Sequence, residues 1–331
     1  MARLAWTLWL GCLIGCGWAD QEEPDLEQTL AQYAAAVGNA LDRSVSATTM
    51  PPLLYPKTRQ LQLGLPEHKI DWLQFAQLHV CDLGDLVGQR NSGLGRVALA
   101  SQRLVYEITF IERLVACRHE LPEWLTELLQ EKRAAVSLLW WNALFAGPEF
   151  RQAMASLASV AQSDTVDDTV LPQLTHLRMA SDSTVEATLE PLLQRIRSAG
   201  FGQRVNNWQQ ISVVVGKVAD ALANRHPAVC LSGSPTPRSR RLVAVFQRHF
   251  VPLQNRLARN QRVDMRWLDD LDQLAATFDA KPSAYVSWRQ QISDVRVELT
   301  QSLVRHQQAW QNLLTQCGLP VQALVPEQEA A

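Results

Sequence analysis

The sequence predicts an all-α protein with long antiparallel helices in a bundle-like body, arranged as one body or as two helical lobes. Apolar residues recur at helical spacing through several long stretches, and runs of β-branched residues are few. Glycine supplies only 15 of 331 residues, below the usual share of about 7%. Helices that end at proline or glycine therefore account for most of the chain.

The first stretch is typical of an export signal. Residues 1–15 combine Arg3 with an apolar run of about a dozen residues, too short to span a bilayer as a helix. The run ends in Leu13-Ile14-Gly15-Cys16, which resembles a bacterial lipobox cleaved before a lipidated Cys16. Gly17 after that cysteine implies the outer membrane, facing the periplasm. Cys12 is a second candidate for lipidation, and an ordinary cleaved signal is the alternative.

A short acidic tether, 16–23, precedes the first predicted helix, 24–43, and residues 44–59 contain three prolines that forbid a regular element. The longest helical pattern follows, from His68 to Cys117. It is apolar on most sides, so we expect a buried, central helix. Gly93 and Gly95 mark a kink, a break or a close backbone crossing.

This stretch also carries a narrow polar stripe. On a helical wheel Asp85, Gln89, Ser92, Arg103 and Glu107 fall within roughly 40° of Arg96. One interpretation is a satisfied polar seam that fixes helix register; the alternatives are a ligand pocket and a catalytic site. The candidate residues are Asp85, Gln89, Arg90, Ser92, Arg96, Arg103, Tyr106 and Glu107.

Further helices are predicted over 123–146, which contains Trp140-Trp141, and over 149–161. The tryptophan pair belongs either to the core or to a ligand-stacking site, and helical spacing favours the core. Residues 164–184 lack sustained periodicity and are expected to link a lobe at 24–163 to a lobe at 185–320. Within the second lobe, helices are predicted near 184–198, 206–225, 240–260, 264–278 and 283–316, before a frayed tail at 321–331.

Arginines dominate one part of the second lobe. Between Pro235 and Arg266 there are eight arginines and one acid, Asp264. In a continuous α-helix all of them except Arg240 share a sector of roughly 120°. We expect either an anion-facing surface for phospholipid, lipopolysaccharide or an acidic partner, or a solvated face paired with acids elsewhere. The candidate residues are Arg238, Arg241, Arg248, Arg256, Arg259, Arg262 and Arg266.

Four cysteines remain once Cys12 is removed with the signal and Cys16 is lipidated, an even number that suggests two disulfides in an oxidising compartment. Cys81–Cys117 and Cys230–Cys317 are the favoured pairs, with free buried thiols as the alternative. The seven histidines form no HExxH or HxH, and no CxxC, GxSxG, P-loop or dinucleotide motif occurs. We therefore expect no metal and no cofactor, and the near-even balance of 31 basic and 33 acidic residues argues against nucleic-acid binding.

Several short words carry a family resemblance: the lipobox, Tyr55-Pro56 with Arg59, Arg90-Asn91-Ser92 through Arg96, and Ser101 through Glu107 with Cys117. They resemble a family of Gram-negative lipoproteins catalogued as domain of unknown function 3080. The resemblance covers most of the mature chain and implies a lipoprotein without implying an activity. We expect a membrane-anchored binding or scaffolding component of the cell envelope; the alternatives are a small-ligand-binding protein that uses the polar stripe and, third, an envelope enzyme.

Overall fold

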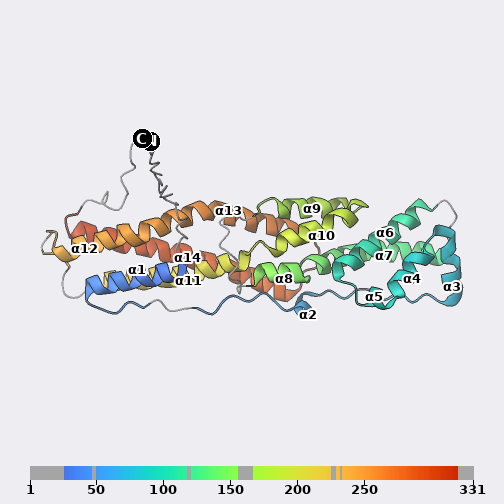
Figure 1. Cartoon of the computed structure of the whole chain (residues 1–331), viewed down its shortest axis with the longest axis horizontal. Helices are drawn as coiled ribbons and strands as arrows, with labels where there is room; N and C mark the ends of the chain where they lie inside the picture. The colour runs from blue at the N-terminus through green and yellow to red at the C-terminus, as the bar shows by residue number, and fades with distance from the viewer. Residues whose placement is uncertain are drawn as a thin grey trace, which may run out of the picture.

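The computed structural model describes residues 26–46, 50–117, 121–155, 167–224, 229–231 and 233–319. Within these ranges the chain is helical and contains no β-strand, which confirms the predicted fold class. The molecule is elongated, with α1 and α12 toward one end and α3 to α7 toward the other (Figure 1). The elements are α1 (Leu26–Leu41), α2 (Thr58–Leu61), α3 (Trp72–Gln77), the 3₁₀ turn η1 (Leu78–Cys81), α4 (Gly84–Asn91), α5 (Gly93–Arg96), α6 (Ala100–Ala116), α7 (Glu123–Leu144), α8 (Pro148–Met154), α9 (Val170–Ala180), α10 (Thr184–Arg197), α11 (Phe201–Ala223), α12 (Pro237–Val245), the π-helix η2 (Phe246–Phe250), α13 (Val251–Ala276) and α14 (Ser283–Gln316).

The signal, the lipobox with Cys12 and Cys16, the tether and the tail at 321–331 lie outside the described residues. None of the described helices is long and apolar enough to cross a membrane.

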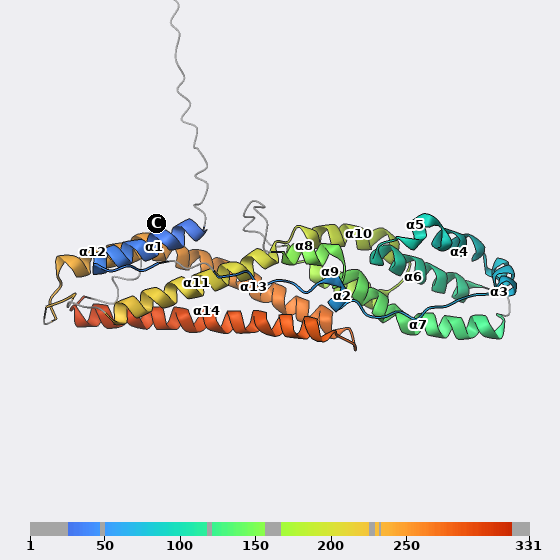
Figure 2. The same cartoon turned by 90° about the horizontal axis from the view of Figure 1, so that it is seen from below.

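The body is built on α11 and α14, which pack along most of their length. The first turns of both helices lie in one hydrophobic cluster and their last turns in another, so the two helices run parallel. α13 follows α11 and precedes α14 in sequence, and it runs in the opposite direction to carry the chain back (Figure 2). α6 and α7 run antiparallel, as predicted for the long helices, and the Lys132 ammonium of α7 lies 2.5 Å from the Glu107 carboxylate of α6.

Three hydrophobic clusters lie in series along the molecule. The largest joins α6 to α11 with α13 and the start of α14, the second joins α1, α11, α12, η2 and the end of α14, and the smallest joins η1, α4, α6 and α7. Trp140 and Trp141 are both fully buried in the largest cluster. Their indole N–H groups donate to Ser181 Oγ at 3.0 Å and to the Leu61 carbonyl at 2.8 Å. The pair is therefore part of the core.

The stretch from His68 to Cys117 does not form one central helix, which corrects the prediction. It is divided into α3, η1, α4, α5 and α6, and it lies at one end of the molecule (Figure 1). The chain turns at Ser92, whose backbone is extended and whose Oγ accepts a hydrogen bond from the Gly95 N–H at 3.1 Å. An added Cβ at Gly95 would lie 2.3 Å from the Gln89 carbonyl oxygen. The close crossing thus requires glycine, and local capping overrides the apolar period.

A second irregular segment, made of the described residues 43–46 and 50–71 apart from the short α2, extends along the molecule between α1 and α3 (Figure 2). Side chains of α11 and α7 hold the described parts of its backbone. Asn206 Oδ1 accepts from the Leu53 N–H at 3.2 Å, and the Asn142 amide makes two bonds of 2.8 Å to the N–H and carbonyl of Leu63. This strap replaces the hydrogen bonds of a regular element with side-chain bonds.

Contacts between described helices cross the expected boundary between the N-terminal and C-terminal lobes. Residues 170–180 of the expected linker form α9, which packs against α10 and α13. α1, which belongs to the expected N-terminal lobe, packs against α11 and α12, which belong to the expected C-terminal lobe. The buried residues of α9, Val170, Leu171, Leu174 and Leu177, recur at helical spacing, but the exposed Met179 and Ala180 add apolar residues to the opposite face and weaken the amphipathic pattern.

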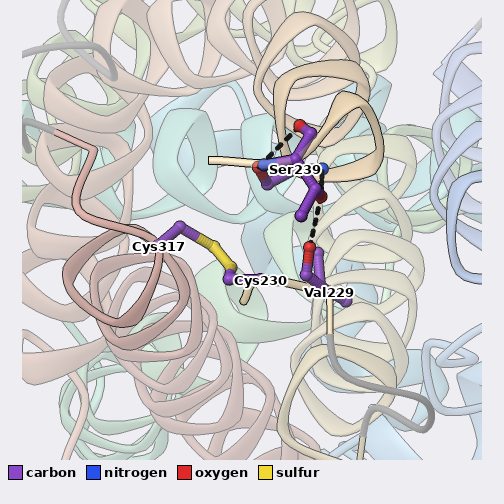
Figure 3. Close-up of a disulfide and its surroundings, with 5 residues drawn as sticks. Val229, Cys230, Ser239 and Cys317 are labelled. Atoms are coloured by element: carbon purple, nitrogen blue, oxygen red, sulfur yellow. Dashed lines mark hydrogen bonds between the residues drawn. A yellow bond between two sulfur atoms is a disulfide. The ribbon is translucent and has the colours of Figure 1, made fainter. Parts of the chain in front are cut away.

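Both predicted disulfides are present: Cys81–Cys117 and Cys230–Cys317. The first closes the small cluster at the α3–α7 end. The second joins the loop before α12 to the end of α14, as Figure 3 shows. In the same loop Thr236 caps α12, since its Oγ1 accepts from the Ser239 N–H at 3.2 Å and donates to the Val229 carbonyl.

Candidate functional site

The predicted polar stripe is divided between α4, α5 and α6. Arg90 folds back so that its guanidinium donates to the Gly95 carbonyl at 2.6 Å, and Ser92 Oγ donates to the Gln89 carbonyl at 2.6 Å. Asp85, Gln89, Ser92 and Arg96 are exposed. These bonds stay within the α4–α5 corner, so this half of the stripe stabilises a turn and presents Arg96 to solvent.

The other half of the stripe is half-buried on α6. Glu107 pairs with Lys132, whose ammonium also lies 4.6 Å from the centre of the Phe110 ring. Burial and the neighbouring Arg90 lower the pKa of Arg103, whereas burial raises the pKa of Tyr106 well above its usual value. The ion pair and the ring contact make this half a packing feature.

The predicted arginine surface lies on α12, η2 and α13. The π-helix is defined by a bond from the Val251 N–H to the Phe246 carbonyl, and it adds about one residue to the helix. Residues of α13 are consequently rotated by roughly 100° relative to a continuous α-helix. In a continuous α-helix the spacing of Arg241 and Arg262 would place both on one face. The residue added by the π-helix rotates Arg262 away from Arg241.

The arginines of this surface fall into two groups by their contacts. Arg238 pairs with Asp42 at the end of α1, and Arg266 lies 2.6 Å from the Asp168 carboxylate. Arg241, Arg248 and Arg262 are exposed and form no ion pair with any other described residue. Arg256 is half-buried, and the side chain of Arg259 lies outside the described part.

Asp264, the one acid of this region, does not neutralise the surface. It is 4% exposed and pairs with Arg204 of α11, and the Trp208 indole N–H lies 3.3 Å from its second oxygen. Elsewhere on the surface, burial and the positive charge of the adjacent Arg248 lower the pKa of His249. The surface thus keeps a local positive charge that anions can neutralise.

A cavity of about 420 Å³ opens between α13 and α14, away from both predicted sites. Arg289 donates to both carboxylate oxygens of Asp272 at 2.7 Å across it. Tyr285 forms part of its wall; its hydroxyl is buried without a hydrogen-bond partner among the described residues, and burial raises its pKa. The lining is Asp272, Ala275, Ala276, Lys281, Tyr285, Val286, Arg289, Gln290 and Ser293.

Sequence reasoning missed this cavity because its lining comes from two helices joined by a turn. The only signal was the spacing of 285, 289 and 293, which any helical face shows. In the part of the chain that the structure describes, no three His, Cys, Asp or Glu side chains gather as metal ligands.

Fold and surfaces define an elongated all-α protein with hydrophobic clusters in series and an exposed arginine surface. The chain belongs to the family described as Protein of unknown function (DUF3080), whose model matches residues 30–321. No curated protein and no solved structure matches the chain.

Proposed function

We propose that the chain is a lipoprotein anchored through Cys16 to the outer membrane, on the periplasmic face, and that it is a binding or scaffolding component of the envelope. In this proposal the arginine surface binds anionic groups, with phospholipid head groups as the class that we test. No catalytic residue is assigned.

The observation that carries the proposal is the position of Arg241 and Arg248 relative to α1. Both are exposed, form no ion pair with another described residue, and lie two helical turns apart on one face, whereas the π-helix turns Arg262 away from that face. α1 runs antiparallel to α12 and η2, since Asp42 at its end pairs with Arg238 and the Tyr33 ring lies 5.5 Å from the Phe250 ring. The first turn of α1 therefore points toward α13.

The length of the tether supports the same geometry. Nine residues separate Cys16 from Leu26, and they span at most roughly 35 Å when fully extended. A chain anchored at Cys16 therefore keeps Leu26, at the start of α1, within that distance of the bilayer. Each basic residue near an anionic surface contributes about 1 kcal/mol to binding.

The anchor is tested by labelling cells with radioactive palmitate. We expect the label in the parent chain and in Cys12→Ala, and none in Cys16→Ala, because acyl transfer requires the Cys16 thiol. Label that persists in Cys16→Ala contradicts lipidation at this residue.

The arginine surface is tested in the Cys16→Ala chain, so that no acyl group contributes. Flotation with vesicles that contain phosphatidylglycerol measures binding, and vesicles of phosphatidylcholine alone are the reference. Replacing Arg241 and Arg248 with Gln should weaken binding roughly 30-fold. The matched control replaces two exposed arginines elsewhere, Arg96 and Arg133, with Gln. Equal loss in both variants contradicts a specific surface.

A further inference from the structure

The outward face of α14 is uncharged over most of the helix. Seven residues fall within a sector of about 80° and extend over about 33 Å. The valines of this face are 54%, 51% and 47% exposed at positions 286, 297 and 304, although valine is usually buried. The seven are Val286, Gln290, Ser293, Val297, Gln301, Val304 and Gln308, and all are exposed except the half-buried Ser293. We call them the α14 stripe.

The α14 stripe has the spacing of a helix-pairing seam and lies at an edge of the molecule. Successive members are separated by steps of 4, 3, 4, 4, 3 and 4 residues, an 11-residue repeat that keeps one face of a nearly straight helix in line. Figure 2 shows α14 along one long edge of the body.

Opposite charges border the two sides of the α14 stripe. Arg289 and Arg296 lie about 80–100° to one side of Val297, and Asp294, Glu298 and Arg305 lie about 60–100° to the other. Arg289 pairs with Asp272 and Arg305 pairs with Glu298, so Arg296 and Asp294 carry the difference in charge between the two sides. Arg296 is exposed and forms no ion pair with another described residue. Asp294 is exposed and accepts a hydrogen bond from Gln290 Nε2 at 2.9 Å.

These edges distinguish between the two ways in which a second copy can pack on the stripe. If the two α14 helices are antiparallel, each edge meets the same edge of the other copy, and Arg296 faces Arg296. If they are parallel, the arginine edge of each copy meets the acidic edge of the other. We propose that the α14 stripe is the contact between two copies of this chain, related by a two-fold axis parallel to α14.

The two-fold axis fixes which residues meet. Val297 lies on the axis against Val297 of the second copy, and Arg296 lies beside Asp294 of the second copy. Because the two copies point the same way, their α1 helices lie at the same position along the two-fold axis. The inference goes beyond the proposed function and stands without it, although two tethers at one height suit a single membrane.

Crosslinking tests the axis directly in the full chain. We expect Val297→Cys to form a disulfide-linked dimer on mild oxidation, in cells and after purification. Gln291→Cys, also exposed but about 120° around α14, is the matched control and should give no more dimer than the parent. Equal dimer from both variants, or none from Val297→Cys, overturns the proposal.

Sedimentation of the full chain with Cys16→Ala tests affinity and orientation. Val297→Glu should raise the dimer dissociation constant at least ~100-fold, because two carboxylates then meet at the axis. Arg296→Glu should weaken the dimer about tenfold, and Arg296→Glu with Asp294→Arg should restore it, because the two edges exchange charge. A parent chain that remains monomeric at 100 µM overturns the dimer, and failure of the double variant to recover overturns the parallel arrangement.

Discussion

His306 is a histidine of α14 held inside the second hydrophobic cluster, 1% exposed. The Trp310 indole N–H, which can only donate, lies 3.2 Å from its Nε2 and 3.1 Å from the Tyr33 hydroxyl oxygen. The Tyr33 hydroxyl lies 2.7 Å from the same Nε2. The rings of Phe246 and Phe250 pack against the imidazole. A protonated imidazole would have no charged partner among these contacts.

Burial lowers the pKa of His306 to about 3, whereas an unfolded histidine titrates near 6.5. As the pH falls, the unfolded chain therefore takes up the proton first. Stability from this group is complete above about pH 6.5 and is lost between about pH 6.5 and 3, by an amount on the order of 3–5 kcal/mol. Urea unfolding across this range should show the loss, and His306→Gln should reduce the slope of stability against pH.

The matched control for this titration is His176→Gln, since His176 is exposed on α9. Its free energy of unfolding should follow the same pH dependence as the parent. If His306→Gln also leaves the slope unchanged, the low pKa of His306 is contradicted.

Asn142 of α7 is a single amide that fixes the strap to the body. It is 3% exposed and bonds both polar backbone groups of Leu63. Asn142→Ala leaves a buried donor and acceptor without partners, so we expect a loss of about 2–3 kcal/mol in the free energy of unfolding. Faster hydrogen exchange should be confined to residues near 60–66.

The control for this prediction is Gln210→Ala, because the bond from Gln210 to the Met50 carbonyl is exposed, and this variant should change the free energy of unfolding little. An equal loss of stability in the two variants would contradict the role of Asn142.

Elements with strong local signals could be predicted from the sequence. The predicted helix over 283–316 matches α14, because Pro282 precedes it and Gly318, with φ of 62°, follows it. The irregular backbone of the described residues 44–46 and 50–57 was predicted from the prolines, although α2 begins at Thr58, inside the predicted loop. The path of the strap could not be predicted, since its partners, Asn142 and Asn206, lie 79 and 153 residues away in the sequence.

The predictions that were wrong share a physical reason: apolar periodicity shows what is buried but not against which element. Residues 68–117 have the composition of a central helix, yet Leu94 and Val97 are 83% and 77% exposed. Hydrogen bonds at Ser92 and a close crossing at Gly95 determined the turn. The arginine surface was found from charge alone, but the π-helix that rotates its second half leaves no clear sequence signal.

At the scale of the whole molecule, the series of clusters predicts that the ends unfold separately. The smallest cluster, at the α3–α7 end, has nine buried members and depends on Cys81–Cys117, which closes 36 residues. A loop of that length contributes about 4 kcal/mol by chain entropy. Cys81→Ser with Cys117→Ser should therefore expose this end to local unfolding while α11 and α14 stay folded.

Native-state hydrogen exchange distinguishes local from global loss. In that variant the amides of α4 and α6 should lose protection by several orders of magnitude, and those of α14 should change little. Cys230→Ser with Cys317→Ser is the matched control, because this disulfide lies in the second cluster, at the opposite end of the molecule. In this variant the amides near the end of α14 should lose protection, and those of α4 and α6 should change little. The reversal follows from contacts: no residue belongs to both the smallest and the second cluster. Uniform loss of protection in either variant would show instead that the three clusters unfold as one cooperative unit.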